Sequence, residues 1–436
     1  MYIINWFNEH IFWGLPMLCL FIGTGVFFSV KLGFFQLNTL KILKQTIFAK
    51  QEKSDEKTLT PFQTLTNSLA LTIGTGNIVA LGTAIALGGA GAVFWMWVSA
   101  ILGMATTYAE NFLGMKYRKP RPDGGYFGGA FHYIEKALGS PAAKLFAVCC
   151  VFASLGIGNM TQINSMSSSM QFSFGTPTWI SGILAVIPVG ILVFGGAKLL
   201  GKVTEKTIPV VSLLYILGCL AVIFMFWRDI PVVLGRIVSE AFGLRAMGGG
   251  AVGVGISKAM SWGFRRGIFS NEAGLGSTVT MNAMSSSQDA HNQGLWATLT
   301  VFFDTIVICT LTALPILLTG ADKAFATADD LGVNLAASAF EAALGDYAGM
   351  FVTVAVVLFA IATCSGWSVF GALCMEYLFG SRSVKPFLVV FVGFAFIGAV
   401  MRLDLVWGLA DLLNSVMAVP NLLAILMLAD KIRLDK

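Results

Sequence analysis

The feature that most constrains this chain is a series of long apolar stretches separated by short charged segments. A helix that crosses a bilayer needs about 20 mostly apolar residues, and eleven stretches meet that length. They are roughly 11–32, 61–87, 90–114, 141–170, 177–196, 205–227, 249–277, 292–318, 347–378, 385–401 and 404–429. We therefore expect an all-α polytopic membrane protein, with a single transmembrane domain over residues 1–436 that is embedded in a lipid bilayer.

Composition excludes the other broad classes of protein. Only 12% of the residues are charged and 56% are hydrophobic, whereas a soluble domain carries about 25% charged residues. Outer-membrane barrels alternate polar and apolar residues and lack long apolar runs. The net charge of +5 comes from short clusters between the apolar stretches, which is typical of membrane topology and argues against a nucleic-acid partner. The seven cysteines form no CxxC pair, so they indicate neither a disulfide framework nor a transition-metal site.

The distribution of Lys and Arg orients the predicted bundle, because cytoplasmic loops carry an excess of positive charge. Positive loops follow the first, third, fifth and ninth stretches, and the C-terminal tail is also positive. The segment 319–346 carries five acidic residues against the single Lys323 and is expected outside. The segment 278–291 has no Lys or Arg and gives no signal. We predict a multi-pass protein of the bacterial-type inner (plasma) membrane, with its N-terminus outside and its C-terminus in the cytoplasm.

Two of the stretches are interrupted by glycines and polar residues. Gly74–Asn77 lies inside the second stretch, and the tract 266–277 in the seventh combines three glycines with a carboxylate, an amide and two serines. Such glycines can serve close helix packing. However, interrupted segments at matching positions of two halves are typical of transporters with inverted repeats. The spacing of five stretches predicts repeats at about 61–227 and 249–429, with the stretch at 11–32 as an extra helix.

A broken helix exposes backbone N–H groups at the start of one half and carbonyl groups at the end of the other. The N–H end attracts anions and the carbonyl end attracts cations, which suits a zwitterionic amino acid with a sodium ion beside it. The N–H groups of Thr75 and Gly76 can hold a carboxylate. The carbonyl groups of Ala70, Thr72 and Ile73 can face the cation.

Polar and aromatic side chains near the breaks extend this predicted site. Gln162 can bind the carboxylate or the ammonium group, or it can form a hydrogen bond between helices. Phe269 and Trp367 can cover a small pocket, or they can serve only in helix packing. The side chains of Ser270 and Thr363 offer hard oxygen atoms of the kind an alkali cation prefers.

Two of the carboxylates inside apolar stretches stand out, because an ionisable group there is functional by default. Asp304 lies in the eighth stretch and Glu272 in the interrupted seventh. Asp304 can instead be structural by pairing with Arg265 or Arg266, and Glu272 can stabilise unwound backbone.

Motifs for other activities are absent from the sequence. No GxxxxGK[ST] loop for ATP-driven transport and no TVGYG channel filter occur. No HExxH or GxSxG motif indicates a membrane protease or esterase. We therefore predict no enzyme activity and no cofactor apart from sodium as a coupling ion.

The chain resembles the alanine or glycine:cation symporter family, the sodium:alanine symporters, over nearly its whole length. The resemblance implies the leucine-transporter fold of five-plus-five inverted repeats, and the uptake of small neutral amino acids with sodium by alternating access. The motifs that carry it are Gly74–Ile78, Ala86–Gly89, Ala92–Trp97, Gly103–Thr106, Tyr108–Glu110, Gly158–Met160 with Gln162, Arg266–Ser277, and Asp304 with Thr305.

Carried over by position, the resemblance assigns the substrate carboxylate to Thr75 and Gly76, and the pocket wall to Gln162, Phe269 and Trp367. We include Ser270 in this substrate-binding set. The Gly-x-Gly-Asn pattern that ends at Asn77 resembles that of the neurotransmitter:sodium symporters, where the amide helps to coordinate sodium. The predicted cation-binding residues are Ala70, Thr72, Ile73, Asn77 and Thr363.

One position departs from the family pattern. Relatives usually carry Ser-Thr where this chain has Ala362-Thr363, so one hydroxyl ligand is missing. The soft sulfur of Cys364 does not replace this hydroxyl group as a ligand for a hard cation, whereas the hydroxyl group of Ser365 can. Two alternatives to sodium symport therefore stay open: a proton-coupled carrier of the same fold, and a receptor that binds an amino acid without transporting it.

Overall fold

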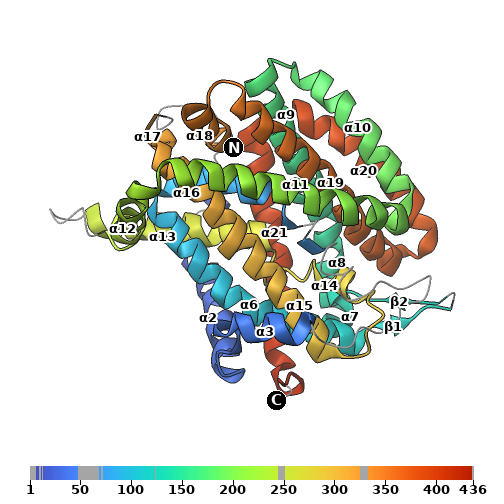
Figure 1. Cartoon of the computed structure of the whole chain (residues 1–436). Coiled ribbons are helices and arrows are strands. Elements are labelled where there is room, and N and C mark those ends of the chain that lie inside the picture. Colours follow the sequence, from blue (N-terminus) through green and yellow to red (C-terminus); the bar gives the residue numbers. More distant parts are fainter. Residues whose placement is uncertain are drawn as a thin grey trace.

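A computed structural model describes residues 6–8, 11, 13–47, 68–69, 72–122, 124–243, 251–324 and 332–434, and these form a bundle made almost entirely of helices (Figure 1). In chain order the helices are α2 (Leu15–Lys31), α3 (Thr39–Ile47), α5 (Leu81–Gly88), α6 (Gly91–Tyr117), α7 (Ala130–Leu138), α8 (Ser140–Leu155), α9 (Thr161–Phe174), α10 (Thr178–Phe194), α11 (Gly196–Met225), α12 (Ile230–Ala241), α13 (Ala251–Asn271), α14 (Val279–Asn282), α15 (Ala290–Val301), α16 (Thr310–Thr319), α17 (Ala321–Ala324), α18 (Leu335–Leu344), α19 (Ala348–Phe379), α20 (Val384–Val400) and α21 (Leu403–Met427).

Three wider π-helical turns interrupt or join these helices. They are η3 (Gly76–Ala80) before α5, η4 (Gly156–Met160) between α8 and α9, and η6 (Phe302–Cys309) between α15 and α16. The two short strands β1 (Lys119–Pro120) and β2 (Tyr126–Phe127) form an antiparallel hairpin after α6.

In the described residues, seven helical tracts are long and apolar enough to cross a membrane. They are Gly91–Tyr117, Ser140–Phe174, Leu199–Met225, Ala290–Thr319, Ala348–Phe379, Ser381–Val400 and Leu403–Met427. Shorter apolar helices add Leu15–Lys31, Gly76–Gly88, Thr178–Phe194 and Leu335–Leu344. The all-α polytopic fold is confirmed, whereas the count of eleven crossings stays a prediction.

Two predicted boundaries differ from the structure. Helix α11 begins at Gly196 and not near 205, so Lys202 and Lys206 lie on an exposed part of this helix and not in a loop. Within the predicted seventh span at 249–277, helix α13 ends at Asn271 and residues 272–277 are not helical. This span therefore does not form one continuous apolar helix.

The elements outside the long helices gather at two ends of the bundle. Helix α3, the hairpin, α7 and the C-terminal end lie in the lower part of Figure 1, whereas α17 and α18 lie at the top. The Arg118 guanidinium donates to the carbonyl oxygens of Ala283, Ser285 and Ser287 at 3.1, 2.6 and 2.6 Å. These bonds place the segment 278–291, which has no Lys or Arg, beside the positively charged hairpin.

Helix α13 packs very closely on α6 because glycines lie at the contact. A Cβ atom at Gly263 would lie 2.5 Å from the Ala92 carbonyl oxygen, and one at Gly267 would lie 2.3 Å from Ser99 Oγ. Small residues allow such close approach between helices in a membrane. These glycines therefore serve packing, unlike those that break the helix further along. The outer face of α10 exposes Ile183, Leu184 and Ile187, as expected of a helix in contact with lipid.

Candidate functional site

The first helix break lies where the glycines of the second stretch predict it. The backbone bends at residues 73–74, and the chain then enters the π-helical turn η3. The Asn77 Oδ1 atom accepts a hydrogen bond from the Gly74 backbone N–H at 2.9 Å, which closes the bend. A Cβ atom at Gly74 would lie 2.5 Å from Thr363 Oγ1. Only glycine lets α19 bring this hydroxyl group against the broken backbone.

The second break follows α13, again as predicted. Helix α13 ends at Asn271, and Glu272, Gly274 and Gly276 have φ angles of 57°, 86° and 74° before α14 begins. Glycine adopts this left-handed conformation readily, whereas a glutamate rarely does. Surrounding contacts must therefore hold Glu272 in place.

The carboxylate of Glu110 holds the unwound segment. It accepts from the backbone N–H groups of Gly274 and Gly276 at 3.2 and 3.0 Å. The Asn421 amide donates both to Glu110 and to the Gly274 carbonyl oxygen, and the Tyr133 hydroxyl donates to Asn421 Oδ1 at 2.5 Å. Backbone polar groups that leave a helix inside a membrane need such partners.

Sequence reasoning assigned no role to Glu110 or Asn421. A signal existed for Glu110, because it is a carboxylate inside an apolar stretch, like Asp304. Asn421 carried no comparable signal, since an amide in a membrane helix more often links two helices.

Asp304 joins the two breaks. Its carboxylate accepts from Asn77 Nδ2 and from the hydroxyl groups of Ser270 and Thr305, each at 2.8 Å. Asn77 comes from η3, Ser270 from α13, and Asp304 and Thr305 from η6. All four side chains are buried. The expected pairing of Asp304 with Arg265 or Arg266 is wrong, because Asp304 binds only neutral donors among its described partners.

The predicted substrate residues Thr75, Gly76, Gln162 and Ser270 come together. The Thr75 hydroxyl donates to Gln162 Oε1 at 2.7 Å, and a Cβ atom at Gly76 would lie 3.0 Å from Ser270 Cα. Gln162 also donates to the Ile157 carbonyl oxygen at 3.1 Å, which lies in the π-helical turn η4. Turns of this kind occur frequently at functional sites.

The two aromatic candidates have different partners. Trp367 Nε1 donates to Glu272 Oε1 at 3.0 Å, and the Ser277 hydroxyl donates to Glu272 Oε2 at 2.5 Å. The Phe269 ring instead stacks on Trp407, with ring centroids 4.7 Å apart. Trp367 therefore supports the unwound segment, whereas Phe269 links α13 to α21.

The predicted cation ligands are partly described. The Thr72 hydroxyl donates to the Ser68 carbonyl oxygen at 3.1 Å, directly before the bend at Ile73. Ala70 lies outside the described residues. On α19, the Ser365 hydroxyl donates to the Ile361 carbonyl oxygen of its own helix at 2.7 Å, which leaves its oxygen lone pairs as acceptors.

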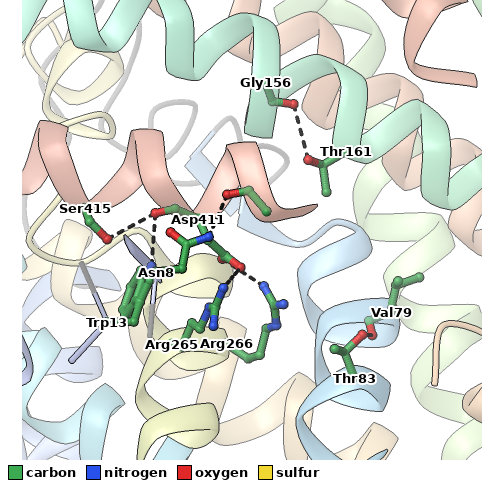
Figure 2. A network of polar contacts seen from close by, with 11 residues as sticks. Asn8, Trp13, Val79, Thr83, Gly156, Thr161, Arg265, Arg266, Asp411 and Ser415 are labelled. Atoms are coloured by element: carbon green, nitrogen blue, oxygen red, sulfur yellow. Dashed lines mark hydrogen bonds and ion pairs between the residues drawn. The ribbon is translucent and has the colours of Figure 1, made fainter. Parts of the chain in front are cut away.

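A separate buried polar cluster connects α13 to α21 (Figure 2). Arg265 and Arg266 both donate to the carboxylate of Asp411, and the Arg266 bond measures 3.0 Å. The Arg266 guanidinium also lies 4.3 Å from the centroid of the Trp407 ring. Sequence analysis did not single out Asp411, although it is a carboxylate inside the stretch 404–429 as Glu110 is inside its own. Its place on α21 gives no sign of the arginines about 145 residues earlier.

A helical membrane bundle with two broken helices around a buried polar centre is the architecture of a secondary transporter. The chain belongs to the sodium:alanine symporter family, whose sequence profile matches residues 1–434. The family and the relatives named below are transporters and not enzymes.

Several relatives match nearly the whole chain. The sodium/alanine symporter AgcS of Methanococcus maripaludis is 41% identical over 98% of this chain and 94% of its own length. The probable sodium/glutamine symporter GlnT of Bacillus subtilis is 34% identical over 96% of this chain and 86% of its own. The putative sodium/proton-dependent alanine carrier protein YrbD of Bacillus subtilis is 33% identical, over 96% and 88%.

Solved structures share the fold at much lower identity. MhsT in complex with L-phenylalanine aligns with a TM-score of 0.62 and 13% identity, over 86% of this chain and 90% of that one. A Na⁺-coupled sialic acid symporter aligns with a TM-score of 0.54 and 11% identity, over 89% and 82%. The fold is thus that of the leucine-transporter group, as the resemblance implied.

Proposed function

We propose that this protein imports a small neutral amino acid, alanine or glycine, together with sodium. The observation that carries the proposal is the direct meeting of the two helix breaks, where Gly76 of one faces Ser270 of the other. Half-helix ends at such a junction attract both charges of a zwitterion. The similarity to a sodium/alanine symporter over nearly the whole chain supports the same substrate class.

In this proposal, the substrate lies between η3, α9 and the end of α13. The N–H groups of Thr75 and Gly76 hold its carboxylate, and Gln162, Phe269, Ser270 and Trp367 surround it. The close contacts at Gly74 and Gly76 leave little room, which favours a small side chain. The bond between Thr75 and Gln162 would be exchanged for bonds to the substrate.

The coupling cation binds to oxygen atoms at the same junction. The proposed ligands are the carbonyl groups of Ala70, Thr72 and Ile73 with the side chains of Asn77 and Thr363. The carboxylate of Asp304 is 2.8 Å from Asn77 Nδ2 and supplies the negative charge that a bound sodium ion would balance.

We propose the topology that follows from the charge pattern. The protein spans the inner (plasma) membrane with its N-terminus outside, and residues 61–227 and 249–429 form inverted repeats after the helix at 11–32. Access to the site from outside the cell then requires α13 and α21 to separate. This movement breaks the contact of Arg265 and Arg266 with Asp411 and the stack of Phe269 on Trp407.

Proton coupling is a second candidate, favoured by one observation. In the described part of the chain, no Lys, Arg or His forms an ion pair with Glu110, Glu272 or Asp304. A proton can balance buried carboxylate charge as a sodium ion can.

Uptake into proteoliposomes tests the proposal. Labelled alanine, glycine, glutamine and leucine are offered with an inward sodium gradient, with choline in place of sodium, and with an inward proton gradient alone. We expect sodium-dependent uptake of alanine and glycine and little uptake of leucine. Uptake driven by protons without sodium would support the second candidate, and binding without uptake would contradict transport itself.

A further inference from the structure

The N-terminal segment, defined here as Asn8 with residues 13–21, donates two hydrogen bonds to one face of α21. Asn8 Nδ2 donates to the Gly408 carbonyl oxygen at 2.8 Å, and Trp13 Nε1 donates to the Asp411 carbonyl oxygen at 3.0 Å (Figure 2). Gly408 and Asp411 are three residues apart and therefore lie on the same side of the helix. Asn8 and Trp13 are both buried. The segment thus fixes the turn of α21 that presents Asp411 to the arginines.

The same segment also contacts the unwound part that follows α13. The rings of Trp13 and Phe21 are nearly parallel, with centroids 5.9 Å apart. A Cβ atom at Gly274 would lie 2.8 Å from the Phe21 ring. One face of the N-terminal segment therefore reaches both α21 and the second helix break.

A third contact ties the segment to the arginine pair itself. The guanidinium carbon of Arg265 lies 6.0 Å from the centroid of the Trp13 ring, within the range of a cation–π interaction. The indole of Trp13 therefore bonds to the Asp411 backbone and lies beside Arg265, the partner of Asp411 on α13.

We propose that the N-terminal segment is a strap that holds α13 and α21 closed, with Asn8 and Trp13 as positioning residues for Asp411. The inference rests on the proposed transport function, in which these helices must separate. Trp13 bonds to α21 and also lies beside Arg265 of α13, so separating the two helices breaks either its bond to the Asp411 carbonyl group or its contact with Arg265. Releasing the strap shifts the population towards the open state.

Access to Cys309 reports this opening without any substrate. Cys309 is buried, and its sulfur lies 3.5 Å from Asn77 Nδ2 at the junction of the breaks. The other six cysteines are replaced by alanine. Right-side-out membrane vesicles in sodium buffer then receive an impermeant methanethiosulfonate reagent from outside, and the rate of Cys309 modification is measured.

Trp13→Phe keeps an aromatic side chain but replaces the indole by a phenyl ring without an N–H donor, and Asn8→Ala removes the other donor. We expect each to raise the modification rate about fivefold, the usual worth of one hydrogen bond. Asp411→Asn is the reference for opening and should raise the rate more. Trp97→Phe is the matched control, because it removes an indole bond to Thr310 elsewhere and should leave the rate unchanged.

The outcomes separate the two proposals. Rates of Trp13→Phe and Asn8→Ala that equal the parent rate, while Asp411→Asn raises it, overturn the strap. An equal rise in Trp97→Phe also overturns it, because the effect is then general loosening. No rise in Asp411→Asn refutes the outer closure and the strap with it. Vesicles that respond as expected but fail to import alanine or glycine refute only the proposed substrate.

Discussion

Helix α13 carries two buried charged clusters that are built in opposite ways. Five and six residues before its end, Arg266 and Arg265 share the single carboxylate of Asp411, which balances one of their two positive charges. At its end, Asp304 and Glu272 are held only by neutral donors among the described residues, including Asn77 and Trp367.

The difference indicates different tasks. A buried ion pair is costly to break because it leaves one charge unpaired, which suits a contact that holds two helices together. Carboxylates surrounded by neutral donors leave negative charge that a mobile cation can balance. The first cluster therefore fits closure of the site, and the second fits the coupling ion.

The largest effect is expected at the second cluster. Asp304→Asn keeps the shape of the side chain and removes its charge, so we expect sodium-driven alanine uptake to fall at least about a hundredfold. Uptake into proteoliposomes measures this, with Glu240→Gln at the periphery as the control. Unchanged uptake in Asp304→Asn would break the comparison.

The first cluster predicts unequal costs for its members. Asp411→Asn leaves two buried guanidinium groups without a counter-charge and should destabilise the protein by about 3–5 kcal/mol. Arg265→Gln leaves a balanced pair of Arg266 and Asp411 and should cost about 1 kcal/mol. Unfolding of the detergent-solubilised protein measures both. Arg402→Gln, in an exposed pair with Asp404, is the control and should cost almost nothing. Equal losses for Asp411→Asn and Arg265→Gln would contradict this assignment.

Glu110 tests whether the unwound segment depends on its carboxylate. Glu110→Gln replaces one of the two carboxylate oxygens by an NH2 group, so either the Gly274 N–H or the Gly276 N–H loses its acceptor. We expect transport to fall about tenfold while the protein still inserts, because a bond to a charged acceptor is worth about 1.5–3 kcal/mol. Uptake, normalised to the amount of protein in the membrane, measures the loss. Asn111→Leu, one residue along α6, is a control in which the segment keeps its acceptor.

The smallest effect is expected at His132, which should change the pH dependence of stability and not that of transport. Burial, together with the charge of Lys119, lowers the pKa of His132 on α7 from 6.5 to about 4. The folded protein thus binds this proton less readily than the unfolded chain, so stability should decline as the pH falls from about 6.5 towards 4. His132→Phe should flatten this part of the profile of melting temperature against pH. An identical profile in the variant would show that His132 makes no such contribution. Any pH dependence of uptake that persists in the variant then belongs to other groups.

Much of the fold could be predicted because hydropathy and glycine act locally. The breaks at Gly74–Asn77 and after Asn271 follow from glycines inside apolar stretches, and the structure contains both. The partners of the buried charges could not be predicted in this way. Asp411 is about 145 residues from the arginines and Glu110 is 164 residues from Gly274, so only the packed bundle selects these pairs.

The role of the predicted site residues is a proposal that one measurement tests most directly. Alanine affinity is measured across a sodium titration for the unmodified protein, Asn77→Ala, Asp304→Asn and Gln162→Ala. Coupling requires that sodium and alanine raise each other's affinity by the same factor. We predict that sodium strengthens alanine binding, that Asn77→Ala and Asp304→Asn weaken this dependence, and that Gln162→Ala lowers affinity at every sodium concentration. A sodium dependence that both Asn77→Ala and Asp304→Asn leave unchanged would contradict the account.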